Sequence, residues 1–95
     1  MEYRDLTNDV RVSRVCFGCW AIGGHGYGDV DDADSVRAID CSIDAGIKTF
    51  DTADTYGLGH SETVLGKAVR GRRHEVVIAS KFGVRRSGNK TYRDI

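Results

Sequence analysis

The sequence predicts an α/β fold built on a parallel sheet. Two segments that begin near Asp31 and Ser61 carry apolar residues three and four positions apart, as an amphipathic helix does. Short apolar segments rich in β-forming residues precede, separate and follow them, at residues 14–18, 47–51 and 75–80. The order strand, helix, strand, helix, strand is typical of parallel strands joined by right-handed crossovers.

The composition favours one globular domain. The 95 residues are 40% hydrophobic and 29% charged and include 12 glycines and no proline, which excludes collagen-like and strongly disordered chains. No run approaches the roughly 18 apolar residues of a membrane span, and the charged start at residues 1–5 is unlike a signal peptide. We therefore expect a cytoplasmic protein with no membrane partner.

Charge and cysteine content exclude further classes of function. The 14 basic and 14 acidic side chains cancel, so no nucleic-acid partner is expected. Basic residues concentrate at 67–93, which indicates either solvated surfaces or an anion-attracting loop after Lys81. Cys16 and Cys19 match the C-x-x-C spacing of redox proteins, but the glycines after Trp20 do not begin the helix that such a site needs. The histidines lack the spacing of zinc ligands, so no metal is expected.

Local signals define the elements in order. Turn-forming residues at 7–9 separate two short extended segments and predict a hairpin, and the run 14–18 predicts a buried strand. The first helix is expected to begin at the acidic residues after Asp31, which favour the positive end of a helix, and to end at Gly46. Its apolar face would comprise Val36, Ile39 and Ile43.

The second helix is expected to have Ser61 as its N-cap and Gly71 as its end. Its apolar face would comprise Val64, Leu65, Ala68 and Val69. The almost unbroken apolar run at 75–80 predicts a strand that is covered on both faces of the sheet.

Two parallel architectures are compatible with this order. A doubly wound dinucleotide fold needs the pattern G-x-G-x-x-G, and the glycine-rich segments 24–29 and 57–62 both lack its sixth residue. A phosphate-binding loop around Gly66 and Lys67 would need glycine at position 61 and serine or threonine at position 68, where the chain has Ser61 and Ala68. The closed (β/α)8 barrel remains, with the two glycine-rich loops interpreted as turns.

In a parallel barrel the functional side chains gather at the carboxyl ends of the strands. Trp20 follows the first strand, Asp51 ends the second with Tyr56 in the loop after it, and Lys81 follows the third. An ammonium group next to a phenol makes the phenol a better proton donor, and a carboxylate keeps the ammonium charged. Tyr56 could then protonate a carbonyl oxygen while a hydride reaches the carbonyl carbon.

Each of these residues also has an ordinary interpretation. Asp51 could cap a turn, Lys81 could be a solvated cation, and Tyr56 could be a half-buried aromatic residue. Trp20 could belong to the core or rim instead of a substrate wall. The combination, more than any single residue, favours a catalytic site.

Four segments in order resemble the N-terminal signatures of the aldo-keto reductases. They are residues 17–24, 46–57 (which contain Asp51-Thr52-Ala53 and Tyr56-Gly57), 59–62 with 65–66, and 79–83. The Gly-x-Ser-Glu sequence at 59–62 is similar to the branch of bacterial and plant reductases and potassium-channel β subunits.

This resemblance implies a (β/α)8 barrel that binds NADP without the dinucleotide fingerprint and reduces a small carbonyl substrate. By motif it implies catalytic roles for Asp51, Tyr56 and Lys81, while the histidine of the family's tetrad has no counterpart among these residues. It also places Gly18, Cys19, Trp20 and Asp51 near the cofactor. Cys19 stands where the family pattern has threonine or another small residue.

The resemblance further implies that residues 1–95 are an incomplete barrel domain, a hairpin plus about three strand-helix units that end before the fourth strand. Residues 90–95 are then expected to approach a third helix. Such a fragment is expected to be inactive alone and to self-associate through unpaired strand edges. Two alternatives are a nucleotide-binding regulatory or scaffold subunit of the same fold and a remnant without function.

Overall fold

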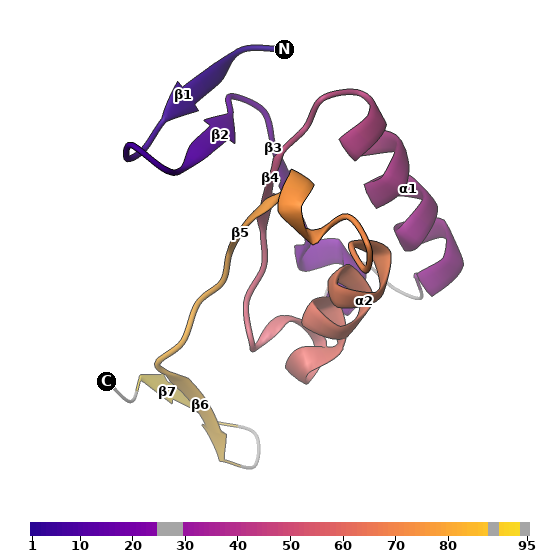
Figure 1. The fold of residues 1–95 in the computed structure, drawn as a ribbon. Helices are drawn as coiled ribbons and strands as arrows, with labels where there is room; N and C mark the ends of the chain where they lie inside the picture. Colours follow the sequence, from indigo (N-terminus) through magenta and orange to yellow (C-terminus); the bar gives the residue numbers. More distant parts are fainter. Residues whose placement is uncertain (25–29, 88–89, 94–95) are drawn as a thin grey trace.

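The computed structural model describes residues 1–24, 30–87 and 90–93 (Figure 1). At the N-terminus, β1 (Tyr3–Asp5) and β2 (Arg11–Ser13) pair antiparallel, which confirms the predicted hairpin. The central sheet is parallel, in the order β3 (Cys16–Gly18), β4 (Thr49–Asp51) and β5 (Val77–Ala79). The predicted parallel sheet is therefore confirmed.

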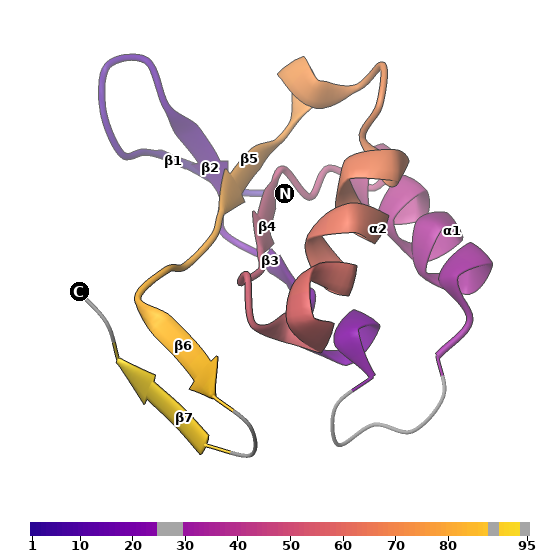
Figure 2. The same ribbon diagram turned by 90° about the horizontal axis from the view of Figure 1, so that it is seen from below.

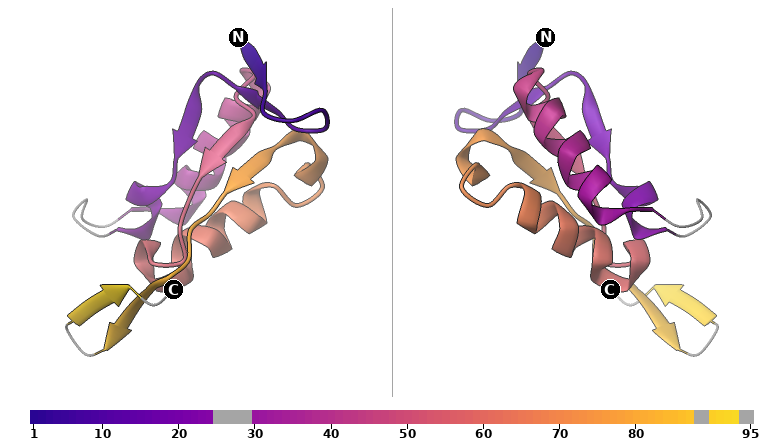
Figure 3. Two further views of the ribbon diagram at one scale, coloured as in Figure 1. Left: turned by 90° about the vertical axis from the view of Figure 1, so that its left-hand side faces the viewer. Right: turned by 90° about the vertical axis from the view of Figure 1, so that its right-hand side faces the viewer.

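Two α-helices lie on the same face of this sheet, as Figures 1 and 3 show. They are α1 (Asp32–Asp44) and α2 (His60–Ala68). Three short 3-10 segments complete the connections: η1 (Trp20–Gly23), η2 (Tyr56–Gly59) and η3 (Arg73–Glu75). Within the described part of the chain, no helix is long and apolar enough to cross a membrane.

Helix α1 begins and ends as its sequence predicts. The side chain of Asp31 caps it by accepting a hydrogen bond of 2.8 Å from the amide of Ala33. Gly46 follows the C-cap Ala45 and has a φ of +102°, a conformation that side chains other than glycine rarely adopt. The glycine therefore lets the chain leave the helix and turn toward β4.

Helix α2 differs from the prediction at its start. Its N-cap is Gly59 and not Ser61, because Gly59 adopts a φ of +100° and the helix already begins at His60. Ser61 lies inside the first turn, where its hydroxyl group is buried. A serine in this position is free to bond to other segments instead of to its own helix.

The core forms where the sheet meets the two helices. Phe50 at the centre of β4 is fully buried, and its register partners on the neighbouring strands are Phe17 and Ile78. The rings of Phe17 and Phe50 lie 5.4 Å apart. Burying a phenylalanine of this kind contributes about 1.5–3 kcal/mol to folding. This contact fixes the strands under the helices.

Strand β5 is less covered than its apolar sequence predicts. Val77 and Ile78 are half-buried and Ala79 is exposed, because the helices cover only one face of the sheet and β5 lies at its edge. The prediction of cover on both faces is therefore wrong for this chain.

The C-terminal residues form a hairpin and not the approach to a helix. Strands β6 (Val84–Ser87) and β7 (Lys90–Arg93) pair antiparallel, and Figure 2 shows them extending away from the helices and the central sheet. Residues 94 and 95 lie outside the described residues. The sequence signal that was missed is Gly88-Asn89, a dipeptide typical of two-residue hairpin loops.

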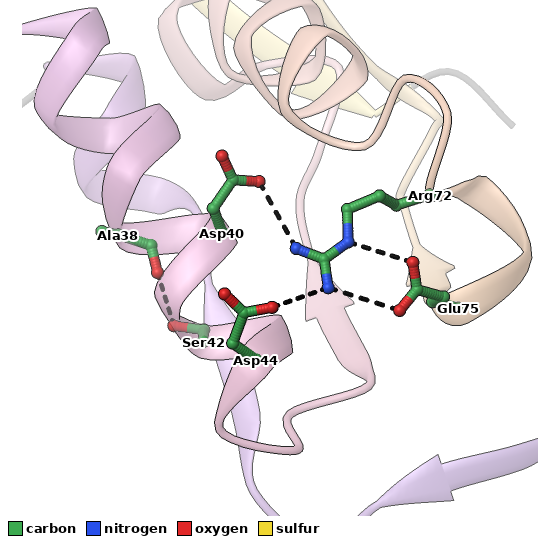
Figure 4. Close-up of polar contacts among 6 residues, drawn as sticks. All are labelled: Ala38, Asp40, Ser42, Asp44, Arg72 and Glu75. Atoms are coloured by element: carbon green, nitrogen blue, oxygen red, sulfur yellow. Dashed lines mark hydrogen bonds and ion pairs between the residues drawn. The ribbon is translucent and has the colours of Figure 1, made fainter.

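A cluster of charges around Arg72 connects α1 to η3 (Figure 4). The Arg72 guanidinium lies 2.8 Å from Asp44, 3.0 Å from Glu75 and 3.9 Å from Asp40. The hydrogen bond from Arg72 lowers the pKa of Glu75. The hydrogen bonds to Glu75 and Asp44 in turn raise the pKa of Arg72. The cluster holds the C-terminal half of α1 next to the segment that enters β5.

Candidate active site

The Lys81 amine lies between the two side chains that the sequence predicts to meet it. Its Nζ donates hydrogen bonds to Asp51 Oδ1 at 2.8 Å and to Tyr56 Oη at 3.2 Å. A third bond, of 3.0 Å, goes to the backbone carbonyl of Thr52. The expected meeting of the carboxylate, the amine and the phenol is present, whereas their catalytic roles stay predictions.

The parallel sheet explains this meeting. Asp51 is the last residue of β4 and Lys81 lies two residues after the end of β5, the strand paired with β4. The carboxyl ends of neighbouring parallel strands lie at the same edge, so both side chains reach the same place. Tyr56 begins η2, the segment that leads from β4 to α2.

The electrostatics favour a charged lysine. The hydrogen bond to Asp51 raises the pKa of Lys81 despite some desolvation, and the bond to Tyr56 adds to the effect. The Lys81 side chain is 51% exposed and the Asp51 side chain 39%, so water screens this ion pair and a substrate can reach it. Lys81 therefore keeps its proton at an accessible edge, with Asp51 balancing its charge.

Trp20 forms a wall of the same site. Its ring is stacked on Tyr56, with ring centroids 6.0 Å apart and an interplanar angle of 16°. The Lys81 Nζ lies 5.0 Å from the centroid of the Tyr56 ring, within the range of a cation–π contact. Because Trp20 is 51% exposed, it lies at the rim and not in the core.

Two glycines let the Trp20 and Tyr56 segments approach each other. A Cβ on Gly23 would lie 2.5 Å from the backbone nitrogen of Gly57, closer than real Cβ atoms come. Gly57 has a φ of +62°, and a Cβ there would lie 2.7 Å from the Gly23 carbonyl oxygen. The segment 57–62 is therefore more than a turn, because η1 and η2 pack backbone against backbone, whereas residues 25–29 of the other glycine-rich segment lie outside the described residues.

Three of the four predicted cofactor-binding residues lie at this edge. Gly18 pairs in register with Asp51, and nothing lies within 4 Å of the position its Cβ would take. Trp20 follows in the next turn. Cys19 differs from the expectation, because its side chain is fully buried in the core and offers no surface to a ligand.

The thiols do not form an activated redox pair. Burial raises the pKa of the Cys19 thiol to about 12, and burial also raises the pKa of Cys16. Reactive C-x-x-C sites need the opposite shift. Among the described residues, no group of three or more His, Cys, Asp or Glu side chains could hold a metal ion. The anion-attracting loop predicted after Lys81 falls largely on side chains outside the described residues.

Two residues of the site were missed by sequence reasoning. Thr52 supplies the carbonyl that accepts a hydrogen bond from Lys81, and Ser61 donates from its hydroxyl to the carbonyl of Cys19 at 2.8 Å. The two hydroxyl oxygens lie 3.0 Å apart. Thr52 follows Asp51 directly in the sequence, and this position next to a predicted site residue could have indicated that Thr52 belongs to the site.

Taken together, an N-terminal hairpin followed by parallel strands, with polar side chains at the strands' carboxyl ends, is the arrangement of the first part of a (β/α)8 barrel. The sequence pattern described as the aldo/keto reductase family matches residues 14–94. The chain belongs to this family.

Relatives and solved structures agree with this assignment. An aldo-keto reductase of Bacillus subtilis is 38% identical over 98% of this chain and 29% of its own length. A probable voltage-gated potassium channel β subunit of Arabidopsis thaliana is 35% identical over 86% of this chain and 25% of its own length.

Two solved structures have a similar fold over this part of the chain. The holo form of an aldo-keto reductase from Bacillus halodurans matches 99% of this chain with a TM-score of 0.83 and 35% identity. An aldo-keto reductase from Klebsiella pneumoniae in complex with NADPH matches 76% with a TM-score of 0.67 and 36% identity. The chain spans 30% and 24% of the lengths of these two proteins.

Proposed function

We propose that this chain supplies the proton-transfer site of an NADP-dependent reductase of aldehydes and ketones. The observation that supports the proposal is the Lys81 amine bonded to both Asp51 and Tyr56 at an exposed edge of the sheet. This arrangement combines an acid that can release a proton with a cation that stabilises the resulting phenolate. The family membership makes an oxidoreductase the natural use of such a site.

Each side chain would have a distinct role. Tyr56 would donate its hydroxyl proton to the carbonyl oxygen, and Lys81 would stabilise the phenolate that remains. Asp51 would hold Lys81 in its charged form. The tyrosine would regain its proton from water, because the amine and the carboxylate beside it are both partly exposed.

The residues present fit one end of a nicotinamide cofactor. Gly18 leaves open space at the strand end, Asp51 offers a carboxylate, and Trp20 offers an exposed aromatic face. These groups suit a planar, polar ring better than a phosphate. When bound, the nicotinamide supplies the hydride that the carbonyl carbon accepts. We propose NADP because the related Klebsiella protein is described in complex with NADPH.

A chimeric barrel tests the proposal. The matched N-terminal segment of the Bacillus subtilis relative is replaced by this chain, and NADPH oxidation is followed with a panel of small aldehydes. Tyr56→Phe is expected to lower kcat by about 10²–10⁴-fold, the usual contribution of a general acid. Tyr3→Phe is the matched control, because its hydroxyl bonds to the Gly46 carbonyl far from the site. Full activity of the Tyr56→Phe chimera would exclude Tyr56 as the acid.

The free chain is proposed to be an incomplete barrel domain that associates through its strand edges. Among the described residues, the outer edges of β3 and β5 pair with no further strand. Exposed edges of this kind are templates for pairing with another chain. Sedimentation velocity of the isolated 95-residue chain is expected to show association that increases with concentration. A monomer at every concentration would contradict this proposal.

A nucleotide-binding regulatory subunit is the second candidate. The similarity to the Arabidopsis potassium channel β subunit supports it. The same chimera separates the two functions, since a regulatory subunit would bind NADPH without turning over any aldehyde of the panel. The third alternative, a remnant without function, predicts neither binding nor turnover.

A further inference from the structure

We propose that Ser61 is a positioning residue that, together with Thr52, holds three segments of the candidate site together. These are the chain after β3 at Cys19, the chain after β4 at Thr52 and the first turn of α2. The two hydroxyl groups are buried beneath the exposed site, with exposed fractions of 0% for Ser61 and 1% for Thr52. The consequence for catalysis depends on the proposed function, but the positioning itself can be measured without turnover.

The direction of each hydrogen bond follows from the number of protons available. Ser61 has one hydroxyl proton and donates it to the Cys19 carbonyl at 2.8 Å. The Thr52 hydroxyl, 3.0 Å away, must therefore donate to the Ser61 oxygen. Ser61 thus accepts from the β4 side and donates to the β3 side, and it connects both to the first turn of α2.

These bonds hold the residue that precedes η1, the short segment that begins with Trp20. The Cys19 amide donates to the Asp51 carbonyl at 2.8 Å, while the Cys19 carbonyl accepts from Ser61. Cys19 is therefore held at both of its backbone groups. Trp20 is the next residue, so the stack of its ring on Tyr56 depends on this anchorage.

Thr52 extends the same network to the lysine. Its amide donates to the Ala79 carbonyl on β5 at 2.8 Å, and its carbonyl accepts from Lys81 at 3.0 Å. Its side chain bonds to Ser61. The buried pair thus connects Trp20 and Lys81, two groups that contact Tyr56 from different segments.

A second serine provides the matched control. Ser13 is also buried, and its hydroxyl donates to the Val15 carbonyl at 2.6 Å and accepts from the amides of Lys48 and Thr49. It lies at the amino ends of the strands and none of its hydrogen bonds reaches the site. Ser13→Ala is therefore expected to lower stability without changing the site.

The reporter is the single tryptophan of the chain. Ser61→Ala leaves the buried Thr52 hydroxyl without an acceptor and removes one donor from the Cys19 carbonyl. The Trp20 turn is then expected to loosen, with loss of the near-ultraviolet circular dichroism of the Trp20–Tyr56 stack and greater quenching by acrylamide. Ser13→Ala is expected to leave both signals unchanged. Thr52→Ser is expected to keep them, since it retains the hydroxyl.

The measurement compares variants whose far-ultraviolet spectra match the parent chain. An unchanged tryptophan signal in Ser61→Ala, or an equal change in Ser13→Ala, would overturn the proposal. Should Ser61→Ala not fold, Thr52→Val removes the Thr52–Ser61 bond and leaves the Ser61–Cys19 bond, so a smaller change in both tryptophan signals is expected, and no change would overturn the proposal. In the chimeric barrel, Ser61→Ala is expected to lower kcat more than Ser13→Ala while KM changes little. An inactive parent chimera would reject the proposed function and leave the spectroscopic result valid.

Discussion

Arg72 and Lys81 are two cations at opposite ends of β5, and they differ in the chemistry of their partners. Arg72 lies among three carboxylates, from Asp40, Asp44 and Glu75. Lys81 has one carboxylate, and its other two partners are a phenol and a backbone carbonyl. A cation surrounded by carboxylates holds segments together, whereas a cation that shares its charge with a phenol can support proton transfer. The difference separates a structural cluster from a reactive one.

The largest effect is expected when each cation is neutralised. Lys81→Met in the chimeric barrel is expected to lower kcat by about 10²-fold or more, because the phenolate loses its stabilising charge. Arg72→Met is expected to lower the melting temperature while the remaining kcat stays close to that of the parent. Steady-state kinetics and thermal unfolding measure the two effects. Equal losses of kcat in both variants would remove the distinction.

A second, intermediate effect is expected from the close approach of η1 and η2. Gly23→Ala places a Cβ 2.5 Å from a backbone atom, and such overpacking is expected to cost about 1–3 kcal/mol or more of unfolding free energy. Gly66→Ala is the matched control, because Gly66 lies in α2 with nothing within 4 Å of its Cβ position. This change is expected to stabilise by about 0.5–1 kcal/mol through helix propensity. Urea unfolding measures the change in unfolding free energy for both variants. An unchanged unfolding free energy in Gly23→Ala would contradict the close approach of η1 and η2.

The smallest effect is expected in the dependence of stability on pH. Asp51 raises the pKa of Lys81 above its ordinary value of 10.5. The stability that this ion pair contributes is therefore complete below about pH 10.5 and is lost as pH rises through the raised pKa. Arg72 lowers the pKa of Glu75 below its ordinary value of 4.5, so that contribution is present above about pH 4.5 and is lost as pH falls.

Urea unfolding across pH measures these two contributions separately. Lys81→Met is expected to flatten the alkaline side of the profile and Arg72→Met the acid side. A Lys81→Met variant that changed only the acid side would contradict the assignment of the ion pair with Asp51.

The meeting of Asp51, Tyr56 and Lys81 could be predicted because it depends on topology. Once three strands are parallel, the ends of neighbouring strands share an edge, whatever the details of packing. The start of α1 was also predictable, since Asp31 caps it through a local hydrogen bond to Ala33. Local signals and strand order are both visible in a sequence.

Features that depend on tertiary contacts were not predictable in the same way. The sequence around Ser61 suits an N-cap, but with Gly59 as the N-cap the helix starts two residues earlier, and the Ser61 side chain links separate segments instead of capping the helix. Cys19 faces the core although its neighbours Gly18 and Trp20 are exposed. The strand at Lys90–Arg93 is a different case, because the dipeptide Gly88-Asn89 before it was a local signal that sequence reasoning overlooked.

The charge that Asp51 keeps on Lys81 also changes how this amine reacts with chemical reagents. An acylating reagent attacks only the unprotonated form of an amine, and the raised pKa of Lys81 makes that form scarcer at a given pH. Lys67, exposed on α2, forms no ion pair with a carboxylate among the described residues. In mass-spectrometric footprinting, Lys67 should therefore be labelled faster than Lys81. The substitution Asp51→Asn removes the carboxylate next to Lys81 and should reduce this difference in labelling rate.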